Sequence, residues 1–147
     1  MRKAVYFIVA LTALILTACQ NDGPIGNMFG TWAVDAYSID DVEQPAPQGC
    51  TFSFQGGVVE AVKVVDEYYT NYQRFGSWSE TPGYITLNFT HSDSQYDVGE
   101  GRYKAPEWLG MTSAEPMVMD CRIEGRSMEW TWHDGNVTRR YKLRKTW

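Results

Sequence analysis

The sequence predicts an all-β fold, an eight-stranded antiparallel barrel of the up-and-down type. Nearly every segment after Phe29 alternates apolar and polar residues, which is the period-two pattern of a half-buried strand. Short turns containing glycine separate most of these segments, so neighbouring strands are expected to pair as hairpins. No convincing amphipathic helix competes with this pattern. Closing eight such strands on themselves removes exposed sheet edges, which makes a barrel the simplest arrangement.

The expected strands follow one another at short intervals. The first covers 29–38, with Trp32, Val34 and Ala36 on one face. The others are expected at 50–55, 58–65, 68–78, 85–90, 117–123, 128–133 and 137–143. The segment 92–115 is long and polar, and we expect a short helix near 106–109 within it. Loops of this length are often lids or binding loops.

The first nineteen residues have the character of an export signal. Arg2 and Lys3 precede an apolar run at 4–16 that is too short to span a bilayer comfortably, since a spanning helix needs about 20 residues. The run ends Leu16-Thr17-Ala18-Cys19, which resembles the bacterial lipobox. That resemblance implies cleavage before Cys19 and acylation of this cysteine. The alternative is a buried membrane segment with an incidental cysteine.

This interpretation divides the chain into three parts. Residues 1–18 would be a cleaved lipoprotein signal peptide, 19–28 a lipidated cysteine with a flexible tether, and 29–147 the barrel domain. Two or three acyl chains anchor a protein stably, whereas one chain is marginal. The tether reaches at most about 30 Å, so the domain would lie close to its membrane. We therefore expect a lipid-anchored protein of the bacterial cell envelope, in the outer membrane. The sequence is compatible with either the periplasmic or the surface face of that membrane.

The charge of the chain argues against nucleic-acid partners. The formal net charge is −5, and removing Arg2 and Lys3 with the signal would make the domain more acidic. An acidic domain lacks the electrostatic footprint of a nucleic-acid binder and is repelled by anionic headgroups. The basic residues between 139 and 145 form the single positive cluster. We interpret this cluster as a solvated strand face with one arginine inside, rather than as a polyanion site.

Lipidation of Cys19 would leave two of the three cysteines. Cys50 shares a face with Phe52 and Phe54, and Cys121 shares a face with Met119 and Ile123. Both faces are expected to point inward, so the two thiols could meet across the interior. Because an exported chain is in an oxidising compartment, we predict a disulfide between Cys50 and Cys121. Two buried free cysteines are the alternative.

The stretch Gly30-Thr31-Trp32 gives the fold a more specific label. A G-x-W in the first strand, with an arginine or lysine in the last, resembles the lipocalins and bacterial lipocalin-like lipoproteins, within the wider group of calycin-like barrels. The segment from Gly76 to Leu87 is similar to the mid-barrel hairpin of the bacterial relatives. The resemblance implies that Gly30 and Trp32 close the barrel floor under a basic side chain. Arg139 and Arg140 are candidates, and Arg139 is favoured because it shares the inward parity of Tyr141 and Leu143.

No residue set has the spacing of a catalytic or metal centre. His91 and His133 are interpreted as lone surface histidines, and neither lies in a metal-binding spacing such as H-x-x-x-H. The acidic pairs Asp40-Asp41 and Asp66-Glu67 could bind calcium or serve a glycosidase, but solvated turns explain them better. We therefore expect no enzyme, no metal and no cofactor.

Aromatic residues are the remaining functional signal. Such rings could fill a core or contact an apolar ligand at the open mouth of a barrel. The candidate ligand-binding residues are Tyr68, Tyr72, Trp78, Trp108 and Trp130. The preferred hypothesis is a non-enzymatic module that binds a small apolar or amphipathic ligand in the barrel mouth. The alternative is a structural or interaction lipoprotein with a solid barrel, whose loops contact a protein or a glycan.

Overall fold

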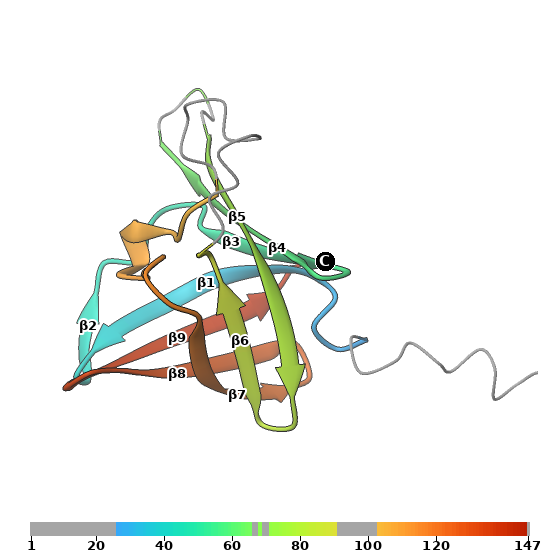
Figure 1. Cartoon of the computed structure of the whole chain (residues 1–147). Coiled ribbons are helices and arrows are strands. Elements are labelled where there is room, and N and C mark those ends of the chain that lie inside the picture. The colour runs from blue at the N-terminus through green and yellow to red at the C-terminus, as the bar shows by residue number, and fades with distance from the viewer. Residues whose placement is uncertain (1–25, 66–67, 69–70, 91–102, 147) are drawn as a thin grey trace, which may run out of the picture.

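The computed structural model of the chain describes residues 26–65, 68, 71–90 and 103–146 (Figure 1). These residues form strands and one short 3₁₀ helix, η2. The elements are β1 (Gly30–Ile39), β2 (Val42–Gln44), β3 (Thr51–Gln55), β4 (Val58–Val64), β5 (Asn71–Thr81), β6 (Tyr84–Asn88), η2 (Glu107–Leu109), β7 (Met117–Glu124), β8 (Ser127–Asp134) and β9 (Val137–Lys145). Within the described ranges, no helix has the length and apolar character needed to cross a bilayer.

The strands form the predicted barrel. Consecutive strands from β3 to β9 pair antiparallel, β1 pairs with β3, and β9 returns to pair with β1. Eight strands thus close the barrel, and the prediction of an eight-stranded antiparallel fold is confirmed. The short strand β2, which the alternation did not predict, forms a hairpin with the end of β1 through Asp40 and Asp41. The expected short helix is found as η2.

The two ends of the barrel are built differently. At one end lie the start of β1, the finish of β9 and the tight turns β3–β4, β5–β6 and β7–β8. We call this the closed end. At the other end lie the β8–β9 turn and the longer connections β2–β3, β4–β5 and β6–β7, the last of which carries η2. We call this the capped end, because η2 lies across it (Figure 1).

The interior is filled by the inward row of each strand. The sequence patterns at 50–55, 85–89, 117–119 and 128–132 are confirmed, because their apolar members are buried and their polar neighbours are not. Trp130 packs edge-on against Phe52 and Phe54, and Trp78 packs edge-on against Phe54. The largest fully buried side chains are Trp32, Trp130, Tyr141, Phe52, Phe54, Phe89, Met28, Ile85, Leu87, Leu109, Met117 and Met119.

A bulge in β1 changes the register of its second half. The pairing with β9 shifts between Val34 and Ala36, so Asp35 faces outward without a regular partner. An extra residue in one strand reverses the inward parity beyond it. Ala36 was therefore wrongly expected on the inward face, and Tyr37 is buried there instead.

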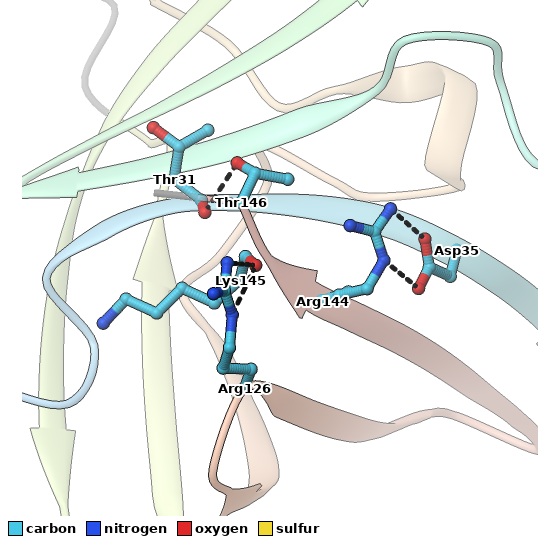
Figure 2. A network of polar contacts seen from close by, with 6 residues as sticks. All are labelled: Thr31, Asp35, Arg126, Arg144, Lys145 and Thr146. Atoms are coloured by element: carbon cyan, nitrogen blue, oxygen red, sulfur yellow. Dashed lines mark hydrogen bonds and ion pairs between the residues drawn. The ribbon is translucent and has the colours of Figure 1, made fainter.

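Polar contacts on the outside reinforce the seam between β1 and β9 (Figure 2). Arg144 Nε donates to Asp35 Oδ2 over 3.2 Å, so the bulged residue faces a cation on the neighbouring strand. Arg126 Nη2 donates to the carbonyl oxygen of Lys145 over 2.8 Å. Thr146 Oγ1 donates to the carbonyl oxygen of Thr31 over 3.0 Å. The Arg144 and Thr146 contacts hold β9 against β1, where the barrel closes, and the Arg126 contact joins the finish of β9 to the β7–β8 turn.

Candidate functional site

The closed end is sealed by the residues that precede β1. Gly30 has a φ of 115°, a conformation that favours glycine, and it turns the chain from this segment into the strand. Trp32 is fully buried, and its Nε1 donates to the carbonyl oxygen of Met28 over 2.9 Å. Met28 is itself fully buried. The floor of the barrel is thus an indole held by the chain that enters the domain.

Lys145, not Arg139, is the basic residue at Trp32. Its Nζ lies 5.3 Å from the centre of the Trp32 ring, and it donates to the carbonyl oxygen of Asn27 over 3.1 Å. The prediction of Arg139 was wrong because β9 runs antiparallel to β1. The register pairs Trp32 with Lys145 and places Arg139 opposite Ile39, at the capped end. There Arg139 Nη1 donates to the Tyr37 hydroxyl over 2.7 Å, and its guanidinium lies 5.9 Å from the Trp132 ring centre.

The predicted disulfide is also wrong, since Cys50 and Cys121 are both free. The two residues face inward at opposite ends of the barrel. Cys50 lies near Lys63, whose strand partner is Tyr72, whereas Cys121 lies near Glu80. Tyr72 and Glu80 are eight positions apart on β5, about 26 Å along a strand, and a disulfide needs Cα atoms within about 7 Å. Burial raises the pKa of each thiol to about 11, so both are neutral near pH 7.

η2 is wedged into the capped end by apolar and polar contacts. Leu109 is fully buried, and its carbonyl oxygen accepts a hydrogen bond of 2.8 Å from the Tyr141 hydroxyl. The Tyr141 ring stacks on Tyr37 with centres 5.1 Å apart. Gly110 ends the helix with a φ of 69°, and a Cβ there would lie 2.5 Å from Arg139 Nη1. The positive φ therefore favours glycine, and a larger residue would also have to displace the Arg139 guanidinium.

An ion pair between Arg74 and Glu107, which we call the latch, holds the other side of η2 to β5. Arg74 faces inward and is only 6% exposed. Its Nη2 and Nε donate to the two carboxylate oxygens of Glu107 over 2.9 and 3.2 Å. Burial raises the pKa of Glu107, but the hydrogen bond and positive charge of Arg74 outweigh it, so the pKa of this carboxyl is below its usual value. A bidentate pair of this kind fixes geometry as well as charge.

Trp108, at the capped end, lies beside two cations. The Arg74 guanidinium is 5.3 Å and the Lys63 Nζ is 5.8 Å from the centre of its ring. Its Nε1 is buried beside the Cys50 thiol, which it approaches without the geometry of a hydrogen bond. The Arg74 guanidinium also lies 5.7 Å from the Tyr72 ring centre. We call this group of side chains the mouth site: Lys63, Tyr72, Arg74 and Trp108.

The candidate ligand-binding residues divide between the core and the capped end. Trp78 and Trp130 are buried in the core, where each indole N–H lacks an acceptor among the described residues. Tyr72 is 48% exposed and Trp108 is half-buried, and both belong to the mouth site. Tyr68 is 83% exposed on the connection between β4 and β5. Tyr72 and Trp108 are thus brought together by contacts with a shared cation, Arg74.

Sequence reasoning missed the charged members of the mouth site. Arg74 shares the inward parity of Tyr72 and Trp78 on β5, and Lys63 shares that of Val59 and Ala61 on β4. A charged residue at an inward position near a strand end could therefore have indicated the mouth site from the sequence. Glu107 gave no such signal, because it lies in η2, outside the strands, where the alternation of inward and outward residues does not apply.

Two hollows on the surface of the described residues lie away from the mouth site. One of about 380 Å³ follows the outside of β1, β9 and β8 next to the Asp35 bulge, and it is lined by charged residues of both signs. Another of about 200 Å³ lies at the closed end, between the β5–β6 turn and Cys121. Among the described residues, no group of histidine, cysteine, aspartate or glutamate side chains is arranged to hold a metal ion.

Two solved structures resemble the chain in fold. A lipocalin-like protein from Bacteroides uniformis ATCC 8492 superposes with a TM-score of 0.55 at 16% identity, over 82% of this chain and 99% of that chain. An uncharacterized protein from Bacteroides eggerthii DSM 20697 superposes with a TM-score of 0.58 at 15% identity, over 80% and 98%. No protein-family model and no curated protein sequence matches the chain. The described residues therefore have the barrel fold of the lipocalin-like proteins.

Proposed function

We propose that the chain is a membrane-anchored, non-enzymatic lipoprotein of the bacterial cell envelope that binds a small apolar or amphipathic ligand at the capped end of its barrel. The observation that carries this proposal is Trp108. Its ring lies half-buried at the mouth, between the cations of Lys63 and Arg74, while the interior below is filled. A ligand would therefore lie in the mouth against these rings, rather than deep in the barrel.

Intrinsic fluorescence tests the binding. Titration with a fatty acid or an apolar dye should shift the tryptophan emission, and Trp108→Ala should weaken both the shift and the affinity. Trp132→Phe is a matched control, because Trp132 is a buried indole near Arg139 outside the mouth site. An unchanged response in Trp108→Ala, or no response to any lipid or dye, would contradict the proposal.

A second function is favoured by the filled interior. The fully buried rings of Trp32, Trp130 and Tyr141 occupy the barrel interior, which would suit a structural or interaction lipoprotein with a solid barrel. Its loops at the capped end would contact a protein or a glycan of the envelope. A reproducible cross-linked partner, lost when the exposed Tyr68 and Tyr72 are changed to serine, would favour this function over ligand binding.

The anchor is tested separately from the barrel. If Cys19 is lipidated, the protein should fractionate with the outer membrane and the mature chain should carry acyl groups detectable by mass spectrometry. Cys19→Ser should abolish both the acylation and the processing before residue 19. A Cys19→Ser chain that is still cleaved at that position and membrane-bound would overturn the anchor, whatever the barrel binds.

A further inference from the structure

Among the described residues, the mouth site contains more positive than negative charge. Arg74 has one carboxylate partner, Glu107, while Lys63 has no ion pair with any described residue. This excess occurs in a chain whose formal net charge is −5. Two cations within 6 Å of one indole thus stand out from the acidic background, at the capped end of the barrel.

The two partners of the latch have very different environments. Arg74 is 6% exposed, so its guanidinium must have an anionic or polar partner whenever the domain is folded. The side chain of Glu107 is 59% exposed, so its carboxylate can return to water at little cost. Glu107 is thus the exchangeable member of the pair, and whatever replaces it must also satisfy Arg74.

We propose that the mouth site binds a single-chain amphiphile with an anionic headgroup, and that the Glu107 carboxylate occupies the headgroup position in its absence. This inference rests on the proposed ligand-binding function and names the chemical class of the ligand. A carboxylate or phosphate would take the paired donors of Arg74, with Lys63 as the second cation. The apolar chain would lie against the faces of Trp108 and Tyr72.

The geometry accounts for selectivity between headgroups. A ligand that moves Glu107 away from Arg74 leaves a buried guanidinium unpaired unless it brings an anion of its own. A neutral alcohol cannot supply that charge, and an ammonium group would be repelled by both cations. Arginine presents two donors in a planar fork that matches two oxygens of a carboxylate or a phosphate.

Matched twelve-carbon probes test the headgroup. Dodecanoate, dodecyl phosphate, dodecanol and dodecyltrimethylammonium, each below its micelle concentration, are titrated into the purified full chain and followed by calorimetry and tryptophan emission. The signal segment is common to all variants, so affinities are compared between variants. Both anions should bind at least about tenfold more tightly than the alcohol, and the stronger of the two identifies the headgroup.

Substitutions then separate the headgroup site from a merely structural latch. Glu107→Gln removes the competing charge and should raise the affinity for dodecanoate severalfold, while Glu60→Gln, on the outer face of β4, should not. Lys63→Gln should lower the affinity for the anions several-fold and leave dodecanol unchanged, while Lys142→Gln on the outer face of β9 should have no effect. Arg74→Gln should abolish the preference for anions. If this variant does not fold, the comparison between the anionic probes and dodecanol is made with Lys63→Gln instead.

The outcomes distinguish this inference from the function on which it rests. Equal binding of dodecanoate and dodecanol, with a response that depends on Trp108, overturns the anionic site and leaves the ligand-binding function standing. An unchanged affinity in both Glu107→Gln and Lys63→Gln likewise overturns the anionic site. No binding of any probe, even in Glu107→Gln, overturns both.

Discussion

The two ends of this barrel close by different physical means. At the closed end, a fully buried indole donates to a backbone carbonyl, tight glycine turns join the strands, and Met28 fills the remaining space. At the capped end, a short 3₁₀ helix is held by a buried arginine, a largely exposed carboxylate and a half-buried ring. The first arrangement depends on apolar burial, whereas the second combines the buried Leu109 with a charged pair that has one largely exposed partner.

This difference indicates a division of roles along the barrel axis. Apolar burial is non-directional and is lost only when the structure opens, so it suits a permanent seal. A charged pair with one exposed partner exchanges readily with water or with a competing anion. The closed end is therefore expected to determine stability, and the capped end to be the part of the described chain that can change its contacts.

Removing one indole at each end gives the largest contrast. Trp32→Ala should lower the free energy of unfolding by about 3–5 kcal/mol, because it leaves a large cavity at a fully buried position. Trp108→Ala should cost less than half of that, since its ring is only half-buried. Urea unfolding followed by circular dichroism measures both. Equal losses would remove the distinction between the two ends.

The free thiols report the two ends independently. A pKa of about 11 for both cysteines predicts native reaction with a thiol reagent at pH 8 at least about 100-fold slower than in the unfolded chain. Cys121 should react before Cys50, because Cys121 is partly exposed and Cys50 is only 2% exposed beneath Trp108. Mass spectrometry of labelled peptides gives the order.

The same reagent tests whether the cysteines are free. In a Cys19→Ser chain unfolded without reductant, two thiols should be counted. A count of zero would restore the disulfide that the structure excludes. Cys50 labelling that slows when dodecanoate is added would indicate that the ligand binds at the capped end, close to Cys50.

The barrel was predictable because its pattern is local. Alternation along each strand and glycine at most turns are properties of a few consecutive residues, and the structure confirms the strands that they predict. The Asp35 bulge was not predictable in this way, because an extra residue leaves no mark on composition. Because of the bulge, Tyr37 faces inward where Ala36 was expected, and the Tyr37 ring stacks on Tyr141.

The alternation of inward and outward residues predicted which side chains face the interior, but not which of them meet. Parity placed Cys50, Cys121 and Arg139 on inward faces, but position along the barrel axis decides which of them meet. That position follows from the register, and the register pairs Trp32 with Lys145 rather than with Arg139. Trp108 was found because its segment is long and polar, while its partner Arg74 became meaningful only after η2 was placed.

The latch should show an asymmetry between its two partners. Glu107→Ala leaves Arg74 buried without a carboxylate and should cost about 1–3 kcal/mol of unfolding free energy. Arg74→Met should cost less, because methionine fills the space and Glu107 returns to water. Urea unfolding of both variants is the measurement. A larger loss in Arg74→Met would mean that the guanidinium stabilises the cap through packing instead.

The latch should also depend on pH in one direction. Burial raises the pKa of Glu107, but the hydrogen bond and charge of Arg74, with a smaller effect of Lys104, outweigh it, so the pKa is lowered in the folded chain. Its contribution is therefore complete above the unfolded pKa, about 4.3, and is lost as the pH falls through the lower folded value. The stability difference between the parent chain and Glu107→Gln should shrink between pH 6 and pH 3. A difference that grows on acidification would reverse this assignment.

The smallest expected effect concerns the cation at the closed end. Lys145→Met removes the contact with the Trp32 ring and the bond to Asn27, and should cost about 0.5–1 kcal/mol, the usual range for a cation–π contact near the surface. Arg139→Met is the control, because it lies at the other end and should leave the environment of Trp32 unchanged. Near-ultraviolet circular dichroism, taken as the difference from the same variants carrying Trp32→Phe, separates the Trp32 band from that of Trp132, which Arg139 contacts. A change in the Trp32 band with Arg139→Met, but not with Lys145→Met, would restore Arg139 as the residue that closes the barrel floor.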